Sequence, residues 1–89
     1  MKLLFRTDAS TSIGTGHVMR CLAFAQAWQD AGGSATFAMA ETTPAIQARL
    51  GAESFEILLV SSLPGTAEDA SETVALARER QARWIAVDG

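Results

Sequence analysis

The amino-terminal part of the chain, residues 2–33, reads KLLFRTDASTSIGTGHVMRCLAFAQAWQDAGG and predicts a strand, a loop and a helix in succession. Lys2–Thr7 is a short apolar run typical of a strand, and residues 8–16 are dense in Asp, Ser, Thr and Gly, as loops are. Residues 17–31 repeat apolar side chains at helical spacing, which indicates an amphipathic helix. Its apolar face would carry Val18, Leu22, Ala25 and Trp28. Gly32 and Gly33 predict its end, because glycine accepts the left-handed conformation of a C-terminal cap.

The rest of the chain continues this alternation. We expect three further strands, at Ser34–Ala40, Ser54–Val60 and Trp84–Val87. One further helix is expected from Thr43 to Gly51, where a threonine cap precedes a proline at the first helical position. Another is expected from Thr66 to about Ala82, where Thr66 and Asp69 resemble a capping box.

This element order predicts an α/β protein. Alternating strands and helices indicate a parallel sheet with helices on both faces, and the strands are near-continuous apolar runs, as such a sheet requires. Right-handed crossovers in the common doubly wound arrangement give four strands in the order 3-2-1-4.

Composition restricts the function. The chain has 89 residues, 48% of them hydrophobic, and a net charge of −3, which predicts one small domain, or part of one, that does not bind nucleic acid. The longest apolar run, Ile57–Val60, is too short for a membrane span. The start of the chain, with Arg6 and Asp8 directly after Met1–Phe5, does not resemble a signal peptide. The single cysteine, Cys21, excludes an internal disulfide, and one histidine with one cysteine cannot build a zinc site. We therefore expect a cytoplasmic protein without metal or cofactor.

Three polar residues are expected to meet at one edge of the sheet. Asp8 follows the first strand, Asp88 follows the fourth, and His17 begins the first helix. In the order 3-2-1-4 the chain changes direction between strands 1 and 4, and ligands bind at such a switch point. Each residue alone is also compatible with a capping role, and Arg20 with simple solvent exposure. Their conjunction favours a binding or catalytic crevice.

The turn Gly14-Thr15-Gly16 precedes a helix, so its backbone N–H groups could hold an anion. A Walker A loop is excluded because Lys2 is the only lysine, and no serine-hydrolase elbow is present. A dinucleotide fingerprint would need glycine at Met19, although Glu41 occupies the place of a ribose-binding acid, and this alternative stays open. At the first turn of a helix the dipole favours neutral imidazole, so His17 is a candidate general base.

The strings Leu4–Ser10 (LFRTDAS) and Ile13–Ala23 (IGTGHVMRCLA) carry a more specific signal. They resemble the start of the UDP-2,4-diacetamido-2,4,6-trideoxy-β-L-altropyranose hydrolases of pseudaminic acid biosynthesis and the related spore-coat polysaccharide biosynthesis proteins. The resemblance covers the whole chain and is strongest over residues 3–25. That family is similar to the two-domain GT-B glycosyltransferases. The resemblance implies that residues 1–89 begin a Rossmann-like amino-terminal domain, that the second nucleotide-binding domain is absent from this chain, and that the isolated chain is inactive.

The resemblance also implies a reaction. His17 would activate water for attack on the anomeric carbon, releasing UDP from a UDP-sugar, and Asp8 would be the second catalytic residue. The implied substrate-binding residues are Arg6, Gly14, Thr15, Gly16, Arg20 and Asp88. A fragment of a GT-B glycosyltransferase and a non-catalytic sugar-nucleotide-binding module are the alternatives. The expected protein partner is the remainder of the enzyme, or a second copy paired through an open sheet edge at Trp84, Ile85 and Val87.

Overall fold

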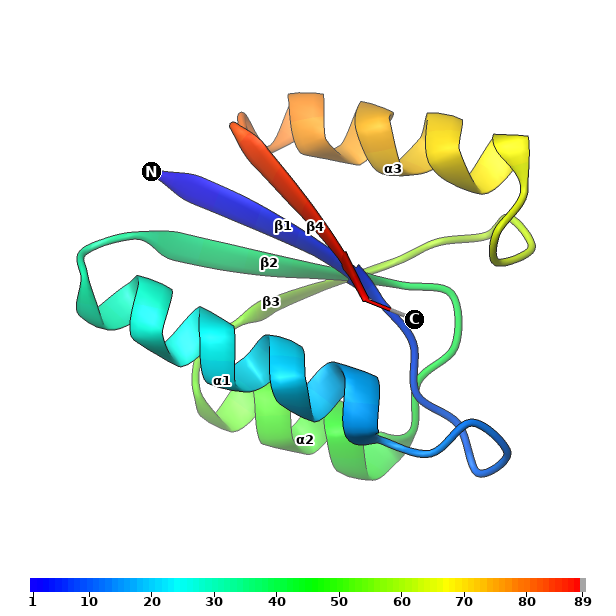
Figure 1. Cartoon of the computed structure of the whole chain (residues 1–89), viewed down its shortest axis with the longest axis horizontal. Coiled ribbons are helices and arrows are strands. Elements are labelled where there is room, and N and C mark those ends of the chain that lie inside the picture. The colour runs from blue at the N-terminus through cyan, green and yellow to red at the C-terminus, as the bar shows by residue number, and fades with distance from the viewer. Residues whose placement is uncertain (89) are drawn as a thin grey trace.

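A sheet of four parallel strands in the order β3-β2-β1-β4 forms the centre of the molecule (Figure 1). The computed structural model describes residues 1–88. Its elements are β1 (Lys2–Thr7), α1 (Gly16–Asp30), β2 (Ser34–Met39), α2 (Pro44–Ala52), β3 (Glu56–Leu59), α3 (Ala67–Glu79) and β4 (Trp84–Asp88). The predicted α/β class, the parallel strands and the strand order are confirmed, and the arrangement is Rossmann-like.

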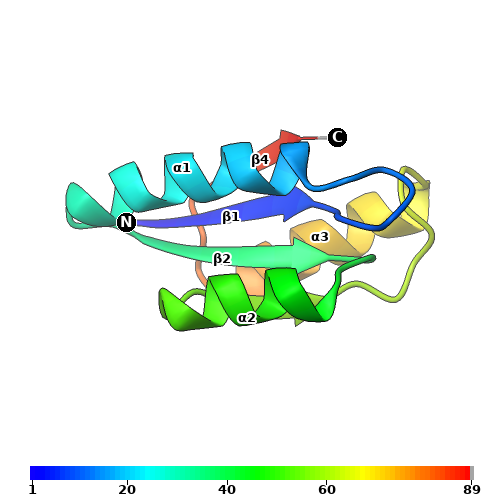
Figure 2. The same cartoon turned by 90° about the horizontal axis from the view of Figure 1, so that it is seen from below.

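The helices cover both faces of the sheet. Helices α1 and α2 lie on one face, and α3 lies on the other (Figures 1 and 2). Side chains alternate along β1, so Leu3 and Phe5 pack in the core under α1 and α2, whereas Leu4 packs with Leu76 under α3. Cys21 belongs to the larger core, and burial raises the pKa of its thiol. Among residues 1–88, no helix has the length and apolar character that a membrane span needs.

Two predicted boundaries are wrong by two or more residues, for local reasons, and the others differ by at most one residue. β3 begins at Glu56 instead of Ser54, because Ser54 has a φ of 65° and the backbone N–H of Phe55 donates to Leu50 at the end of α2. α3 ends at Glu79 instead of near Ala82, because Gln81 has a φ of 57° and turns the chain toward β4. Ser54 and Gln81 carry no glycine signal, so their left-handed conformation is not visible in the sequence pattern.

The helix caps agree in part with the sequence. Thr43 accepts the N–H of Ile46 at 3.2 Å, and Thr66 accepts the N–H of Asp69 at 3.2 Å, so both predicted caps form. The capping box at Thr66 is only half formed. In a complete box the Asp69 carboxylate would accept the backbone N–H of Thr66. That N–H donates instead to the carbonyl of Leu63, and the Asp69 carboxylate accepts hydrogen bonds from Arg6. α1 begins after Thr15 without a side-chain cap.

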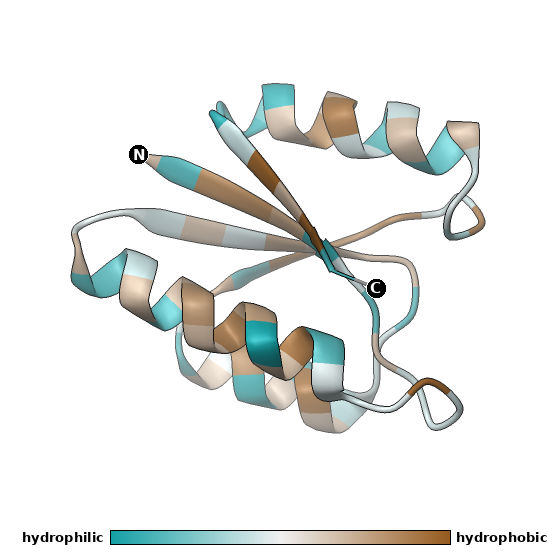
Figure 3. Ribbon diagram, viewed as in Figure 1, coloured by the Kyte–Doolittle hydropathy of each residue, from teal (hydrophilic) through white to brown (hydrophobic). Residues whose placement is uncertain are grey.

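Strand β4 forms one edge of the sheet. It pairs with β1 from Leu3↔Trp84 to Thr7↔Asp88, and among the described residues its other side pairs with no strand. Hydrophobic segments of this strand stand out in Figure 3, and the residues Trp84 and Val87 are 60% and 72% exposed. The register also places Asp88 beside Thr7, at the carboxyl ends of the parallel strands.

Candidate functional site

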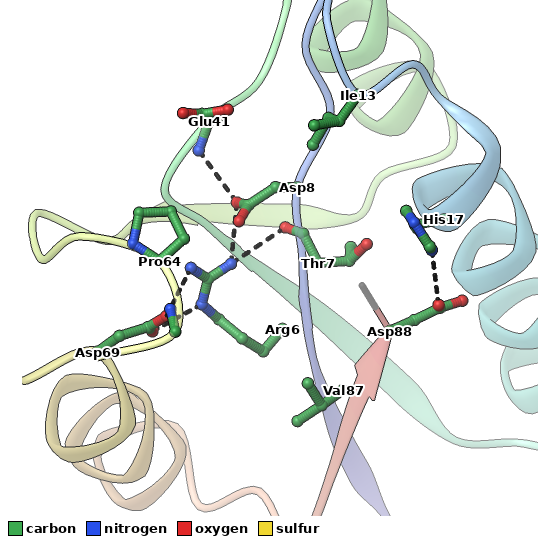
Figure 4. Close-up of a pocket in the computed structure, with 11 residues that line it drawn as sticks. Arg6, Thr7, Asp8, Ile13, His17, Glu41, Pro64, Asp69, Val87 and Asp88 are labelled. Carbon is green, nitrogen blue, oxygen red and sulfur yellow. Dashed lines mark hydrogen bonds and ion pairs between the residues drawn. The ribbon is translucent and has the colours of Figure 1, made fainter. Parts of the chain in front are cut away.

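A cleft of about 380 Å³ lies at the carboxyl ends of β1 and β4 (Figure 4). It is lined by Arg6, Thr7, Asp8, Ile13, His17, Glu41, Pro64, Gly65, Asp69, Val87 and Asp88. These residues come from all four strand ends or the loops that follow them, and from the first turns of α1 and α3. The predicted convergence of Asp8, His17 and Asp88 on one crevice is confirmed, and the crevice lies at the switch point between β1 and β4.

One wall of the cleft is formed by His17 and Asp88, which contact Arg20 outside the lining, and we call these three residues the histidine cluster. The Nδ1 atom of His17 lies 2.8 Å from Oδ1 of Asp88. Arg20 donates from Nε to Oδ2 of Asp88 at 3.1 Å and from Nη2 to Oδ1 at 3.0 Å. Hydrogen bonds from Arg20, and then from His17, lower the pKa of Asp88 below its ordinary value. Asp88 is therefore a carboxylate held at both oxygens and directed at a histidine ring.

The opposite wall is formed by the arginine cluster, which consists of Arg6, Asp8 and Asp69 (Figure 4). Arg6 is only 6% exposed, and it donates to Asp69 in a bidentate arrangement, from Nε to Oδ1 at 2.8 Å and from Nη2 to Oδ2 at 3.0 Å. Its Nη1 atom donates to Asp8 at 2.9 Å. Burial lowers the pKa of Arg6, but the hydrogen bonds to Asp69 and Asp8 outweigh this effect and raise it. The guanidinium is thus paired with two carboxylates, and the expected contact between Arg6 and substrate stays a prediction.

Asp69 is the partner that the sequence did not assign to the site. Its hydrogen bond with Arg6 is the largest influence on its carboxyl group, and together with the N–H of Gly65 and the hydroxyl of Thr73 it lowers the pKa to about 2. The acidic first turn of α3 was visible in the sequence, but only as a helix cap. The pair with Arg6 joins residues 63 positions apart, and helical or strand periodicity does not report contacts of that range.

Asp8 connects two strand ends. Its Oδ1 atom accepts the backbone N–H groups of Ala40 at 2.7 Å and Glu41 at 3.0 Å, in addition to Nη1 of Arg6. These contacts tie the end of β1 to the segment that follows β2. Asp8 therefore has the capping role that was the alternative to catalysis, although its carboxylate still lines the cleft.

The glycine turn lies beside the cleft. Gly14 has a φ of 78°, and its backbone exchanges hydrogen bonds with Ser10 at 2.8 and 3.3 Å, which closes a small loop. Ile13 of this loop lines the cleft, while Gly14, Thr15 and Gly16 are exposed and lie outside the lining. Arg20 also lies outside the lining, and its contacts are with His17 and Asp88.

The floor of the cleft includes Thr7, which the sequence did not single out. Its Oγ1 atom is buried and has no hydrogen-bond partner among the described residues. In residues 1–88, no three His, Cys, Asp or Glu side chains are grouped as a metal site would need. The chemistry available in the cleft is therefore that of a histidine with a carboxylate partner, next to a buried and charge-paired arginine.

Comparisons of the chain with protein-family models, with curated proteins and with solved structures found no match. The fold and the cleft define the class of this protein: it is a Rossmann-like α/β protein with a histidine–aspartate pair at the switch point of its parallel sheet. The resemblance carried by residues 3–25 stays a prediction.

Proposed function

We propose that this chain is the amino-terminal part of a nucleotide-sugar hydrolase that releases UDP from a UDP-linked diacetamido-trideoxy sugar. The observation that carries the proposal is the contact of 2.8 Å between Nδ1 of His17 and the Asp88 carboxylate, inside a cleft at the switch point. The substrate class comes from the resemblance of residues 3–25, and the reaction type comes from the chemistry of the pair.

The pair is suited to accepting a proton from water. When Nδ1 carries a proton and donates it to Asp88, the lone pair of the ring lies on Nε2, at the other side of the imidazole. A water bound at Nε2 would transfer a proton to it while the water oxygen attacks the anomeric carbon. The bond between that carbon and the diphosphate oxygen breaks, and UDP leaves with the electron pair. The Asp88 carboxylate stabilises the imidazolium that forms.

The cleft has a size that suits one sugar unit. Its volume of about 380 Å³ falls at the lower end of the usual range for small-molecule sites, roughly 300–1,000 Å³. A complete nucleotide sugar would extend beyond it. This agrees with the proposal that a second domain, outside this chain, binds most of the nucleotide.

The test measures UDP release by the full-length natural protein, with and without an added sugar or lipid acceptor. Replacement His17→Ala should lower kcat by ~10²–10⁴-fold, the usual contribution of a positioned acid or base, and leave the Kd for UDP within about twofold. Asp30→Asn, which removes an exposed carboxylate at the end of α1, is the matched control and should leave kcat unchanged. Full activity of a folded His17→Ala protein would contradict the proposal. Dependence on the acceptor would identify a transferase, and binding of UDP without turnover would identify a non-catalytic module.

A further inference from the structure

Arg20 contacts His17 directly at the amino-terminal end of α1. It lies one turn along α1 from His17, and its side chain is 62% exposed. Its Nη2 atom lies 2.6 Å from Nδ1 of His17 and 3.0 Å from Oδ1 of Asp88. The nitrogen Nδ1, the carboxylate oxygen and the guanidinium nitrogen therefore form a triangle of mutual contacts, with the third side of 2.8 Å between His17 and Asp88.

Asp88 and Arg20 compete for a hydrogen bond with Nδ1 of His17. A neutral imidazole nitrogen has one hydrogen-bonding position, which is either an N–H group or a lone pair. If Nδ1 carries the proton, only the carboxylate of Asp88 can accept it, and the guanidinium faces an N–H group. If Nδ1 carries the lone pair, only Arg20 can donate to it, and the carboxylate faces a lone pair. Asp88 therefore favours the tautomer protonated on Nδ1, and Arg20 favours the tautomer protonated on Nε2.

We propose that Arg20 is a positioning residue that controls the tautomer of His17. While its guanidinium contacts Nδ1, the proton is held on Nε2, and His17 cannot accept a proton there. When the guanidinium turns away, Nε2 gives its proton to water and Nδ1 takes one from water, with no net change in charge. Nδ1 then donates a hydrogen bond to Asp88, and the lone pair on Nε2 can accept a proton. The catalytic consequence rests on the proposed function, whereas the control of the tautomer does not.

The exposure of Arg20 indicates what would move it. Arginine binds phosphate oxygens in a bidentate, charge-assisted arrangement, so an anionic phosphate group near α1 competes with the histidine cluster for the guanidinium. By drawing Arg20 away from His17, a diphosphate substrate would favour the tautomer in which Nε2 can accept a proton. The charged groups that line the other walls of the cleft are Arg6, Asp8, Glu41 and Asp69. Since Arg6 is paired with two carboxylates, Arg20 is the arginine of the site that is exposed to an incoming anion.

The experiment reads the two ring nitrogens of His17 by ¹⁵N NMR in this chain, at about pH 9, where histidine is ordinarily neutral. His17 is the single histidine, so its signals need no further assignment. Arg20→Gln should raise the ratio of the Nδ1-protonated to the Nε2-protonated tautomer by ~10-fold or more, as expected for removal of a hydrogen bond to a charged group. Asp88→Asn should move the ratio in the opposite direction. Arg49→Gln, which removes another exposed arginine paired with a carboxylate, should leave it unchanged.

Adding inorganic pyrophosphate to the unaltered chain provides a second test, which needs no substitution. Saturating pyrophosphate should move the tautomer of the unaltered chain toward Nδ1–H, and it should have no further effect on Arg20→Gln. The same tautomer ratio in the unaltered chain and in a folded Arg20→Gln chain would overturn the proposal. An unaltered chain whose ratio does not respond to pyrophosphate would overturn the coupling to an anion. Both results are independent of UDP release, so they are distinguishable from a failure of the proposed function.

Discussion

The two clusters in the cleft use their charges differently. In the arginine cluster, the buried guanidinium of Arg6 is surrounded by carboxylate oxygens of Asp8 and Asp69. In the histidine cluster, the carboxylate of Asp88 is held by the exposed Arg20 and directed at His17. The first arrangement gives each nitrogen of the Arg6 guanidinium a hydrogen-bond partner and stabilises the loops around the cleft. The second leaves one side of the imidazole ring available to a ligand.

Acid should weaken the arginine cluster. The pKa of Asp69 is about 2 when folded and 3.8 ordinarily, so the unfolded chain binds a proton more readily between these values. The stabilisation is therefore fully present above pH 3.8 and is lost as the pH falls through about 2. Urea unfolding at about pH 5 and about pH 2.5 should show a smaller acid-induced loss of stability in Asp69→Asn than in the unaltered chain. Equal losses in the two proteins would show that folding does not lower the pKa of Asp69, and Asp30→Asn is the exposed control.

At the scale of helices and strands, the caps give a matched pair of substitutions. Thr43 accepts the N–H of Ile46 at the start of α2, whereas Thr15 makes no side-chain cap at the start of α1. Thr43→Ala should therefore lower the free energy of unfolding by ~1 kcal/mol, and Thr15→Ala should change it by less than about half of that. Chemical denaturation of both variants measures the difference. Equal effects would mean that the hydrogen bond at Thr43 does not stabilise α2.

The sequence predicted elements better than contacts between them. The strand β1, the caps at Thr43 and Thr66 and the convergence of His17 with Asp88 follow from apolar periodicity, local capping chemistry and the geometry of parallel sheets. The pairing of Arg20 with Asp88 spans 68 positions and depends on the rotamers of exposed side chains, which no periodicity encodes. For the same reason the sequence did not reveal that the guanidinium of Arg6 is paired with Asp69 and Asp8.

At the scale of the whole molecule, the open side of β4 is the feature most prone to association. Edge strands with exposed apolar side chains and unpaired backbone groups favour pairing with another chain. The chain should show concentration-dependent self-association in sedimentation and should bind a hydrophobic dye. Val87→Lys should reduce both effects, because a charge on an edge strand opposes pairing. Leu63→Lys, at an exposed leucine in the loop before α3, should not. A chain that stays monomeric at high concentration and binds no dye would contradict this prediction.

The fold as a whole brings His17 and Asp88 together from positions 71 residues apart, and the central claim is that they act as one unit. A double-mutant cycle on kcat for UDP release by the full-length natural protein tests this most directly. If Asp88 acts only through His17, then His17→Ala combined with Asp88→Asn should be no slower than His17→Ala alone, which is expected to lose ~10²–10⁴-fold. If the two losses multiply in the double variant, Asp88 acts independently of the histidine, and the proposed pair is contradicted.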